Sequence, residues 1–331
     1  MNARVTIATL SKQIITEADA YRHLEGMRWS GAPVCAHCDG TDVYLIPPAN
    51  GVSRKTAAGK MSERRVWKCR ECKRQFSVLT GTIMHATKIS VRTWVLVIFD
   101  MCASKNGISA REVERRYGVS ARSAWHMLHR IRHAMANHGS DTMVGLLVAD
   151  ETWIGGDPKN DHHYKPQPKP EVFQPGSIRP NQHTDKTPVL CLINAETGEA
   201  RSAVVADVTG KTLRKAIAQN ANIAASHLMT DESSSYKAFS SEWLSHQSVN
   251  HSKGEYVRGN VSTNMAENFF SQLKRSIDGT HHHVSKEHLS RYLGEFDFRY
   301  TTCKLPDVER MAILGHRLEG RLSYKRVKAS N

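Results

Sequence analysis

Four cysteines in this sequence have the spacing of a metal site. Cys35 and Cys38 form one C-x2-C pair, and Cys69 and Cys72 form a second pair thirty residues later. Each pair can bind one metal ion from a tight turn, and two pairs complete the tetrahedral thiolate shell that zinc prefers. The alternative, a redox C-x-x-C, needs a single pair beside a βαβ pattern. The spacing therefore predicts a structural Zn2+ ion, without which so small a module does not fold.

Three carboxylates further along the chain have the order of a phosphoryl-transfer site. Asp150 and Asp231 each end a predicted buried strand, and Glu267 lies near the start of a predicted helix. Converging carboxylates repel one another unless cations neutralise them. Two Mg2+ or Mn2+ ions about 3.5–4 Å apart would do so, and would also activate a water or a DNA 3′-hydroxyl and stabilise the leaving oxygen. We therefore expect a catalytic site with two metal ions.

Each of these acidic residues also has an ordinary structural explanation. Aspartates at strand ends are often turn residues or helix caps. Glu267 closes a capping box if Asn264 begins the helix, because Asn264-Met-Ala-Glu267 has the form of one. Glu151 points to the opposite face of its strand from Asp150, which makes it a weaker metal candidate. Asp207 also ends a predicted strand and is the main competitor.

Two consecutive helices are predicted in the basic first part of the chain. A capping box at 109–112 opens a short helix that runs to about Tyr117. A tight turn at Gly118 precedes a second helix, which Ser120 caps and which runs to about Asn137. This order is typical of a helix-turn-helix whose second helix enters the major groove, although many helical hairpins bind nothing. The candidate DNA contacts on the second helix are Arg122, Ser123, His126 and Arg130.

The elements predicted after residue 141 would bring the three carboxylates together. The predicted strands are 144–150, 188–194, 200–208, 226–231 and a short one near 246–252; the predicted helices are 210–223, 233–239 and 263–277. Three strands in a meander, followed by alternating helices and strands, favour an α/β fold with an RNase H-like sheet. In such a sheet the first and fourth strands are adjacent, so their terminal aspartates become neighbours.

Charge is concentrated at one end of the chain. The sequence has 46 Lys+Arg and 32 Asp+Glu, a net charge of +14; residues 1–140 contain 22 basic and ten acidic residues, a net of +12. A basic region beside a nearly neutral one indicates a polyanion partner, and the alternative is a solvated basic surface. The 40% hydrophobic content is that of a folded globular protein. No apolar run approaches the roughly 18–20 residues that span a bilayer, so we expect no membrane partner.

The 331 residues are enough for two or more domains. We expect an N-terminal helical segment at 1–30, a zinc ribbon at 31–82, a helix-turn-helix region at 83–140, an RNase H-like domain at 141–305 with a Pro-rich basic insertion at 157–187, and a tail at 306–331 that is a short basic helix or frayed. The N-terminus lacks the pattern of a secretory signal. We therefore expect a cytoplasmic protein whose seven cysteines are reduced rather than paired in disulfides.

Three stretches of the sequence carry a family resemblance. They are VADETWIGG at 148–156, LMTDESSSYKAF at 228–239 and the block at 262–300 that begins STNMAENFFSQLKRSIDG. The thirty-five residues between Asp231 and Glu267 match the spacing in the second half of the DDE superfamily. The sequence resembles bacterial insertion-sequence transposases of that superfamily, in the ISXO-like subfamily with an N-terminal zinc ribbon. With the ribbon and the helical hairpin, the resemblance covers most of the chain.

The resemblance implies roles for the matched residues. Asp150 and Asp231 match the two metal-binding aspartates. The third position is Glu267 or Asn264, which lie near the start of the same helix, and we expect Glu267 to be the magnesium ligand. Lys274 would hold the DNA backbone near the scissile phosphate, although its position on the helix also suits a solvated surface residue, and Arg275 is a further candidate DNA contact.

The activity that the resemblance implies is transposition. The protein would bind the terminal inverted repeats of an element, cleave the DNA and join it to a target, associated with the bacterial nucleoid when bound. Holding two ends together implies a homo-oligomer on double-stranded DNA. One alternative is a DNA-binding regulator that has lost catalysis, which predicts a broken acidic set. Another is an RNase H-like nuclease without strand joining, which does not need two modules for reading specific ends.

Overall fold

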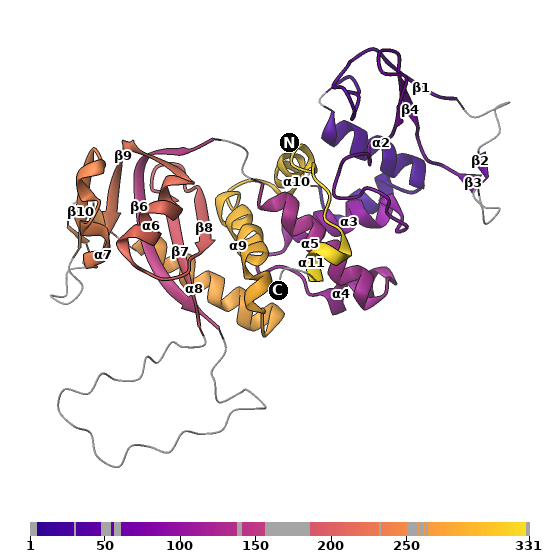
Figure 1. Ribbon diagram of the computed structural model, residues 1–331. Coiled ribbons are helices and arrows are strands. Elements are labelled where there is room, and N and C mark those ends of the chain that lie inside the picture. The colour runs from indigo at the N-terminus through magenta and orange to yellow at the C-terminus, as the bar shows by residue number, and fades with distance from the viewer. Residues whose placement is uncertain are drawn as a thin grey trace. The chain divides into compact units, whose positions relative to one another are not determined.

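The computed structural model consists of two compact units (Figure 1). The first contains residues 1–137 with 302–331, and the second contains residues 138–301. The structure describes residues 5–29, 31–47, 54–55, 61–137, 141–155, 186–231, 233–249, 257–258, 261–262 and 264–328. Among these residues, no helix has both the length and the apolar character needed to cross a membrane.

Helix α3 (Val91–Ala103) is the centre of the first unit. Its sequence is apolar on nearly every side, and nine of its thirteen residues are buried. A helix of this kind has to be covered by neighbours all round. The helices that contact it are α1 (Ile7–Gln13), α2 (Glu17–Arg28) and α10 (Asp307–His316).

The two helices of the predicted hairpin are present as α4 (Ala110–Tyr117) and α5 (Ala121–Met135). Gly118 ends α4 with a φ of 65°, in the left-handed region where glycine is favoured. Ser120 then caps α5 by accepting a hydrogen bond from the backbone N–H of Ser123. The residues expected on the apolar face of α5 are all buried, namely Ala124, Leu128, Ile131 and Met135.

A small antiparallel sheet carries the cysteine pairs. Its strands, in the order β1-β4-β5, are β1 (Val43–Leu45), β4 (Trp67–Cys69) and β5 (Gln75–Phe76); β2 (Arg54–Lys55) and β3 (Met61–Ser62) form a separate hairpin. Trp29 packs edge-on against Trp67 and Phe76, with ring centroids 6.0 and 6.1 Å apart. Glu25 of α2 accepts a hydrogen bond from the indole N–H of Trp67 at 2.9 Å. The sheet therefore shares its core with the N-terminal helices.

The segment after Pro306 differs from the expected tail. It contains two helices, α10 and α11 (Tyr324–Lys328), and belongs to the first unit. Arg310 of α10 donates a hydrogen bond to the carbonyl oxygen of Cys102 at the end of α3. The physical reason is an apolar spacing of three and four residues that buries one side of the segment, at Met311, Leu314 and Leu318.

The second unit is built on a five-stranded mixed sheet in the order β10-β9-β6-β7-β8. The strands are β6 (Met143–Ile154), β7 (Thr187–Asn194), β8 (Ala200–Val204), β9 (Ala221–Thr230) and β10 (Ser245–Ser248). Strands β6, β7 and β8 form the antiparallel meander, while β9 runs parallel to β6. The first and fourth strands are thus adjacent, as the sequence predicted.

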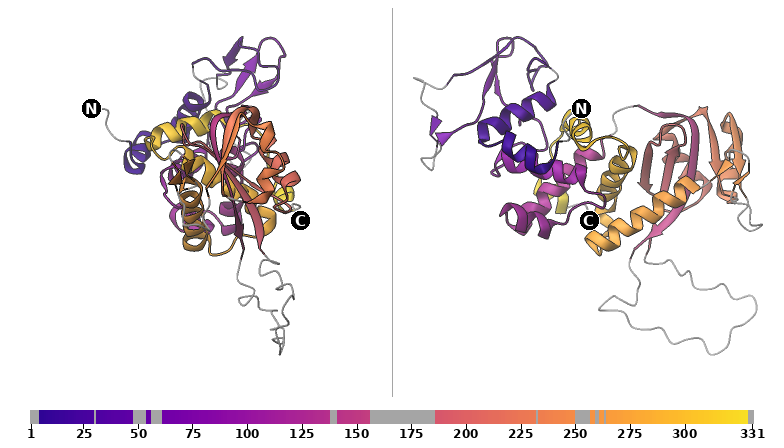
Figure 2. Two further views of the ribbon diagram at one scale, coloured as in Figure 1. Left: turned by 90° about the vertical axis from the view of Figure 1, so that its left-hand side faces the viewer. Right: turned by 180° about the vertical axis from the view of Figure 1, so that it is seen from behind.

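Helices cover both faces of this sheet (Figure 2). Because side chains alternate along a strand, Leu147 and Ala149 of β6 face one core and Val148 faces the other. The first core is covered by α6 (Gly210–Ala218) and α7 (Ser234–Lys237), and the second by α8 (Asn264–Ser276) and α9 (Lys286–Thr301). Short elements complete the unit: η3 (Ser240–Glu242), β11 (Val257–Arg258), β12 (Val261–Ser262) and a π-helical turn, η5 (Ile277–His281).

Several predicted boundaries in the second unit move, among them the start of β9, which lies at Ala221 rather than at residue 226. Strand β6 continues past Asp150 to Ile154, because β7 pairs with it as far as Thr187. Strand β8 ends at Val204 rather than at 208, and α6 ends at Ala218 because β9 already begins three residues later. The predicted Pro-rich insertion at 157–187 lies, up to residue 185, outside the described residues.

Candidate active site and zinc centre

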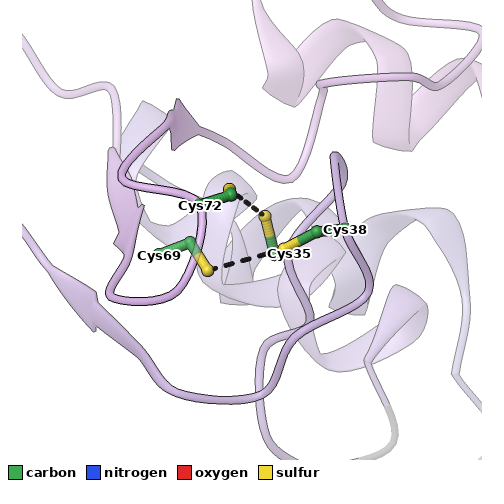
Figure 3. Close-up of side chains that lie close together, drawn as sticks. All are labelled: Cys35, Cys38, Cys69 and Cys72. Atoms are coloured by element: carbon green, nitrogen blue, oxygen red, sulfur yellow. Dashed lines mark hydrogen bonds between the residues drawn. The ribbon is translucent and has the colours of Figure 1, made fainter.

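The four cysteines of the two C-x2-C pairs meet in the first unit (Figure 3). Cys35 and Cys38 lie in the turn before β1, whereas Cys69 ends β4 and Cys72 follows it in the turn to β5. The Sγ atoms of Cys35 and Cys72 are 3.6 Å apart, and those of Cys38 and Cys69 are 3.7 Å apart. All four Sγ atoms lie within 4.8 Å of one another.

This geometry fits one zinc ion. Zn–S bonds of about 2.3 Å in a tetrahedron place the sulfur atoms about 3.8 Å apart, close to the two distances in the cluster. His37, between the first two cysteines, hydrogen-bonds through Nε2 to the carbonyl oxygen of Gln75 at 3.3 Å instead of joining the cluster. Asp39 and Lys73, the residues after each pair, have φ of 58° and 62° and turn the chain sharply at the same point of both pairs. The four thiols are thus the complete ligand set for structural zinc.

Asp150 and Asp231 are placed side by side in the second unit. In the parallel pairing of β6 with β9, Val148 is opposite Met229. Asp150 follows Val148 by two residues, and Asp231 follows Met229 by two residues. Both are half-buried. Each has one carboxylate oxygen held by a backbone N–H: that of Glu151 at 2.8 Å for Asp150, and that of Ser233 at 3.0 Å for Asp231. Asp150 shares the face of Val148 and so belongs to the side covered by α8 and α9.

Glu151 and Tyr236 lie on the opposite side of the sheet from Asp150. The Tyr236 hydroxyl faces Glu151, but neither it nor the buried Oε1 of Glu151 makes a hydrogen bond of normal geometry with the described residues. Burial raises the pKa of Glu151 to about 7, and the charges of Asp150 and Asp231 raise it as well. Burial raises the pKa of Tyr236 well above its usual range, with the same carboxylates contributing. The carboxylates of Asp150, Glu151 and Asp231 therefore lie near enough for their charges to interact.

Sequence reasoning gave Glu151 little weight and did not single out Tyr236. The available signal was the position of Tyr236 on the short helix directly after Asp231, in the matched stretch 228–239. That helix returns its tyrosine to the sheet beside the strand ends. Only the packing of α7 shows which acidic residue the tyrosine meets.

Helix α8 presents the remaining predicted site residues. Its buried face carries Ala266, Phe269, Phe270 and Leu273, which pack in the core of the second unit. Helix α8 begins just after β12, and β12 contacts β9. The start of α8 therefore lies near β9, the strand that precedes Asp231. The exposed residues on the other side of α8 include Asn264, Glu267, Lys274 and Arg275. The first three are spaced by three and seven residues and share one helical face.

Among the described residues, only the four cysteines form a group of three or more potential ligands whose donor atoms lie within 4.8 Å of one another. Asp150, Asp231 and Glu267 do not form such a group. The structure therefore places Asp150 and Asp231 at neighbouring strands and Glu267 on α8, without bringing their carboxylates into one cluster.

Two family models match this chain. Residues 142–301 match the ISXO2-like transposase domain, and residues 15–75 match the transposase zinc-ribbon domain. The chain carries an ISXO2-like transposase domain behind a transposase zinc ribbon. The first matched range contains the predicted acidic residues, and the second contains the four cysteines, so the two candidate sites fall in the two matched domains.

One relative matches this protein over nearly the whole chain. It is an uncharacterised protein in transposable element ISH50 of Halobacterium salinarum, 23% identical over 301 residues, which are 91% of this chain and 96% of that one. A chain in the structure of the simian T-cell lymphotropic virus intasome in complex with PP2A regulatory subunit B56 gamma is 13% identical. It aligns with 59% of this chain and 66% of its own length at a TM-score of 0.26, which is too low to support an argument about the site.

The four predicted DNA contacts on α5 differ in how accessible they are. Arg122 and Ser123 lie in the first turn of the helix, where Arg122 is exposed and Ser123 is half-buried. The Nε2–H of His126 donates a hydrogen bond to the carbonyl oxygen of Leu322 at 3.1 Å, because a carbonyl oxygen can only accept. Arg122 and Ser123 could therefore contact a DNA groove, whereas His126 is hydrogen-bonded to the C-terminal segment.

Arg130 is turned further inward than the other three. It is only 8% exposed, donates to the carbonyl oxygen of His85 at 2.9 Å and stacks over Trp94 with its guanidinium carbon 5.1 Å from the ring centroid. These contacts leave it little surface to offer to base edges.

Asp207, the competing acidic residue, lies three residues beyond the end of β8 in an exposed turn. Hydrogen bonds from the hydroxyl and backbone N–H of Thr209 hold its carboxylate and lower its pKa. Its surroundings are those of a turn residue before α6.

Proposed function

We propose that this protein is the transposase of an insertion sequence, which binds the terminal inverted repeats and catalyses metal-dependent strand cleavage and strand transfer. The observation that carries the proposal is the position of Asp150 and Asp231, each two residues beyond the last paired residues of the adjacent parallel strands β6 and β9, within the region that matches the ISXO2-like transposase domain. The match to that domain supports DNA cleavage and joining as the general class of reaction.

The chain's own residues fit a pair of hard divalent cations. Burial raises the pKa of Glu151 most, and the charges of Asp150 and Asp231 raise it further, so three carboxylates interact at this end of the sheet and a cation there would offset their repulsion. Asp150 and Asp231 would hold the ions, with Glu267 as the third ligand and Asn264 as the alternative. When bound, two Mg2+ or Mn2+ ions would activate the attacking oxygen and stabilise the leaving one.

The remaining residues divide into DNA-holding groups. Lys274, seven residues after Glu267 on the same exposed face of α8, would hold the backbone near the scissile phosphate, with Arg275 beside it. Arg122 and Ser123 in the first turn of α5 would meet the major groove of the terminal repeat. Because cleavage and joining act on two element ends, we also propose that the protein forms a homo-oligomer on DNA.

Cleavage of an end-labelled duplex carrying the flanking repeats tests the proposal. With Mg2+, we expect the wild-type protein to cut at the element end and Asp231→Asn to bind equally well but cut at least roughly a hundredfold more slowly, because one metal ligand is lost. Asp207→Asn is the matched control, since it changes an exposed carboxylate in a turn before a helix, and it should cut normally.

Three results would count against the proposal in different ways. Equal cleavage by the wild type and by Asp231→Asn would remove this aspartate from the metal site. Specific binding without any cleavage would favour the regulator. Cleavage that ignores the repeats and never yields joined products would favour a nuclease.

A further inference from the structure

A pocket in the first unit lies where three separate stretches of chain meet. Its volume is about 590 Å3, and it is lined by His85 and Ala86, by His126 and Arg130 of α5, and by Arg321, Leu322 and Ser323 near the C-terminus. The C-terminal wall is held against α5 by the hydrogen bond between His126 and Leu322 and by Tyr324, whose ring meets that of His126 edge-on at 5.5 Å. The pocket therefore exists only when the C-terminal segment is docked on the hairpin.

The walls of this pocket are positively charged, and none of the described residues that line it is acidic. Arg130 is 8% exposed, and its Nε has no hydrogen-bond partner among the described residues. Burial lowers the pKa of Arg130 to about 10, and the neighbouring charge of Arg321 lowers it too. A buried guanidinium without a carboxylate partner is costly, and an anion in the pocket would offset that cost.

The available donors suit a phosphate group. His85 accepts a hydrogen bond at Nδ1 from the backbone N–H of Gly81 at 3.3 Å, so its neutral ring carries the proton on Nε2. The pocket thus offers an imidazole N–H together with the guanidinium groups of Arg130 and the exposed Arg321. Guanidinium forks match the paired oxygens of a phosphate.

The position on α5 indicates where such a phosphate would come from. Arg130 follows Arg122 by eight residues, which is about 12 Å along a helix. The major groove is also about 12 Å wide. When the first turn of a helix contacts the base edges, residues about two turns later therefore lie near the DNA backbone that borders the groove. A duplex read from the start of α5 would bring a phosphodiester to this pocket.

We infer that the pocket lined by His85, Arg130 and Arg321 binds a backbone phosphate of the DNA that α5 contacts. The inference rests on the proposed function in taking DNA as the partner. It gives Arg130 a phosphate contact in place of base reading and makes His126 a positioning residue for the C-terminal wall. It also adds Arg321, some 190 residues beyond the hairpin, to the DNA-binding surface.

The test is the salt dependence of DNA binding by the full-length, zinc-loaded protein. For Arg321→Ala, an exposed position that folding tolerates, we expect affinity for the repeat duplex to fall roughly tenfold and the slope of log K against log[salt] to shrink by about 0.9, the value of one lost phosphate contact. Ethylation of one particular phosphate should block wild-type binding and no longer affect the variant. Arg22→Ala is the matched control, since Arg22 is an exposed arginine of the same unit paired with Asp19, and it should behave as wild type.

Each contrary outcome has a distinct meaning. An unchanged slope and footprint in Arg321→Ala, with affinity lost in Arg122→Ala, would overturn the phosphate pocket and leave the proposed DNA binding intact. Thermal stabilisation of the wild type but not of Arg321→Ala by inorganic phosphate, with DNA binding unaltered, would assign the pocket to a free anion and overturn its role on DNA. Absence of repeat-specific binding by the wild type itself would sink the proposed function along with the inference.

Discussion

The sulfur atoms of the four ribbon cysteines already have nearly the spacing that a zinc ion would impose. Zinc supplies the energy that a module of this size cannot obtain from its core, with binding free energies of roughly 10–16 kcal/mol in small zinc modules. The ribbon has only short strands, of two or three residues, beside its contacts with Trp29 and α2. We therefore expect its fold to depend on the ion.

We expect Cys69→Ser to release zinc and unfold the ribbon. The purified wild-type protein should contain about one zinc ion per chain, and the variant almost none, because three thiolates and a hydroxyl bind zinc far more weakly. Metal analysis and protease resistance of the ribbon would measure both effects. Cys303→Ser, at an exposed cysteine outside the cluster, is the control. A ribbon in Cys69→Ser that stays folded in the presence of chelator would show that zinc does not stabilise it.

Asp297 of α9 is a buried carboxyl whose pKa is changed by its surroundings. Its side chain is buried, and its carboxylate accepts hydrogen bonds from the backbone N–H and the hydroxyl of Ser202 on β8, at 2.8 and 2.7 Å. Burial raises its pKa from 3.8 to about 7 despite these bonds. The folded state thus holds the proton more tightly than the unfolded chain does.

This shift makes stability depend on pH with a definite sign. A carboxyl with a raised pKa stabilises the fold most at low pH, and that contribution is lost as pH rises from 3.8 toward about 7. Relative to Asp297→Asn, which cannot ionise, the wild type should lose roughly 2 kcal/mol of unfolding free energy between about pH 5 and pH 8. Urea unfolding of both proteins across this range measures the difference. A difference that does not change with pH would contradict the buried, titrating carboxyl.

Residues whose role depends on local spacing were predictable, and those whose role depends on packing were not. The cysteine pairs could be recognised because each pair acts from one turn. The neighbourhood of Asp150 and Asp231 followed from strand order. The burial of Arg130, the partner of Glu151 and the position of Asp297 depend on segments far away in sequence, so no local pattern showed them.

Two helical glycines test the packing of the elements in the first unit. A Cβ added at Gly26 of α2 would meet nothing within 4 Å, whereas one added at Gly315 of α10 would lie 2.9 Å from the Cβ and 3.0 Å from the carbonyl oxygen of Met27. The close approach of α10 to α2 thus needs the missing side chain at Gly315.

We expect opposite effects of the same substitution at these two sites. Gly26→Ala should raise the free energy of unfolding by about 0.5–1 kcal/mol, because alanine favours the helix. Gly315→Ala should lower it by about 1–3 kcal/mol, because α10 must move away from Met27. Chemical denaturation of both variants gives the comparison. Equal stabilisation by the two substitutions would mean that α10 does not pack on α2 in this way.

Among the elements, sheet order and the hairpin helices followed from the sequence, while the ends of the elements did not. Strand β7 is apolar from Pro188 to Ile193, and Gly118 marks the turn between α4 and α5 through its left-handed φ. The end of β6 depends on its pairing with β7 across a long insertion. The role of α10 was missed because its apolar face completes a core whose other helices lie some 200 residues earlier.

At the scale of the whole molecule, the excess of basic residues and the candidate carboxylate site lie in different units. The net charge of +14 lies mostly in the first 140 residues, which hold the ribbon and the hairpin, whereas the paired aspartates lie in the second unit. DNA affinity is then expected mainly from the first unit and strand chemistry from the second. The C-terminal helices belong to the first unit although the second unit precedes them in the chain, so the second unit is inserted within the sequence of the first.

The central claim is that this chain joins DNA as well as cutting it. The most direct measurement is strand transfer: a precut duplex with a free 3′-hydroxyl at the repeat, a supercoiled target plasmid, Mg2+, and either the wild-type protein or Asp150→Ala. We predict joined products with the wild type and none with the variant, which should still bind the repeat normally. Absence of joined products with the wild type, or joining that persists in Asp150→Ala, would contradict the proposed transposase.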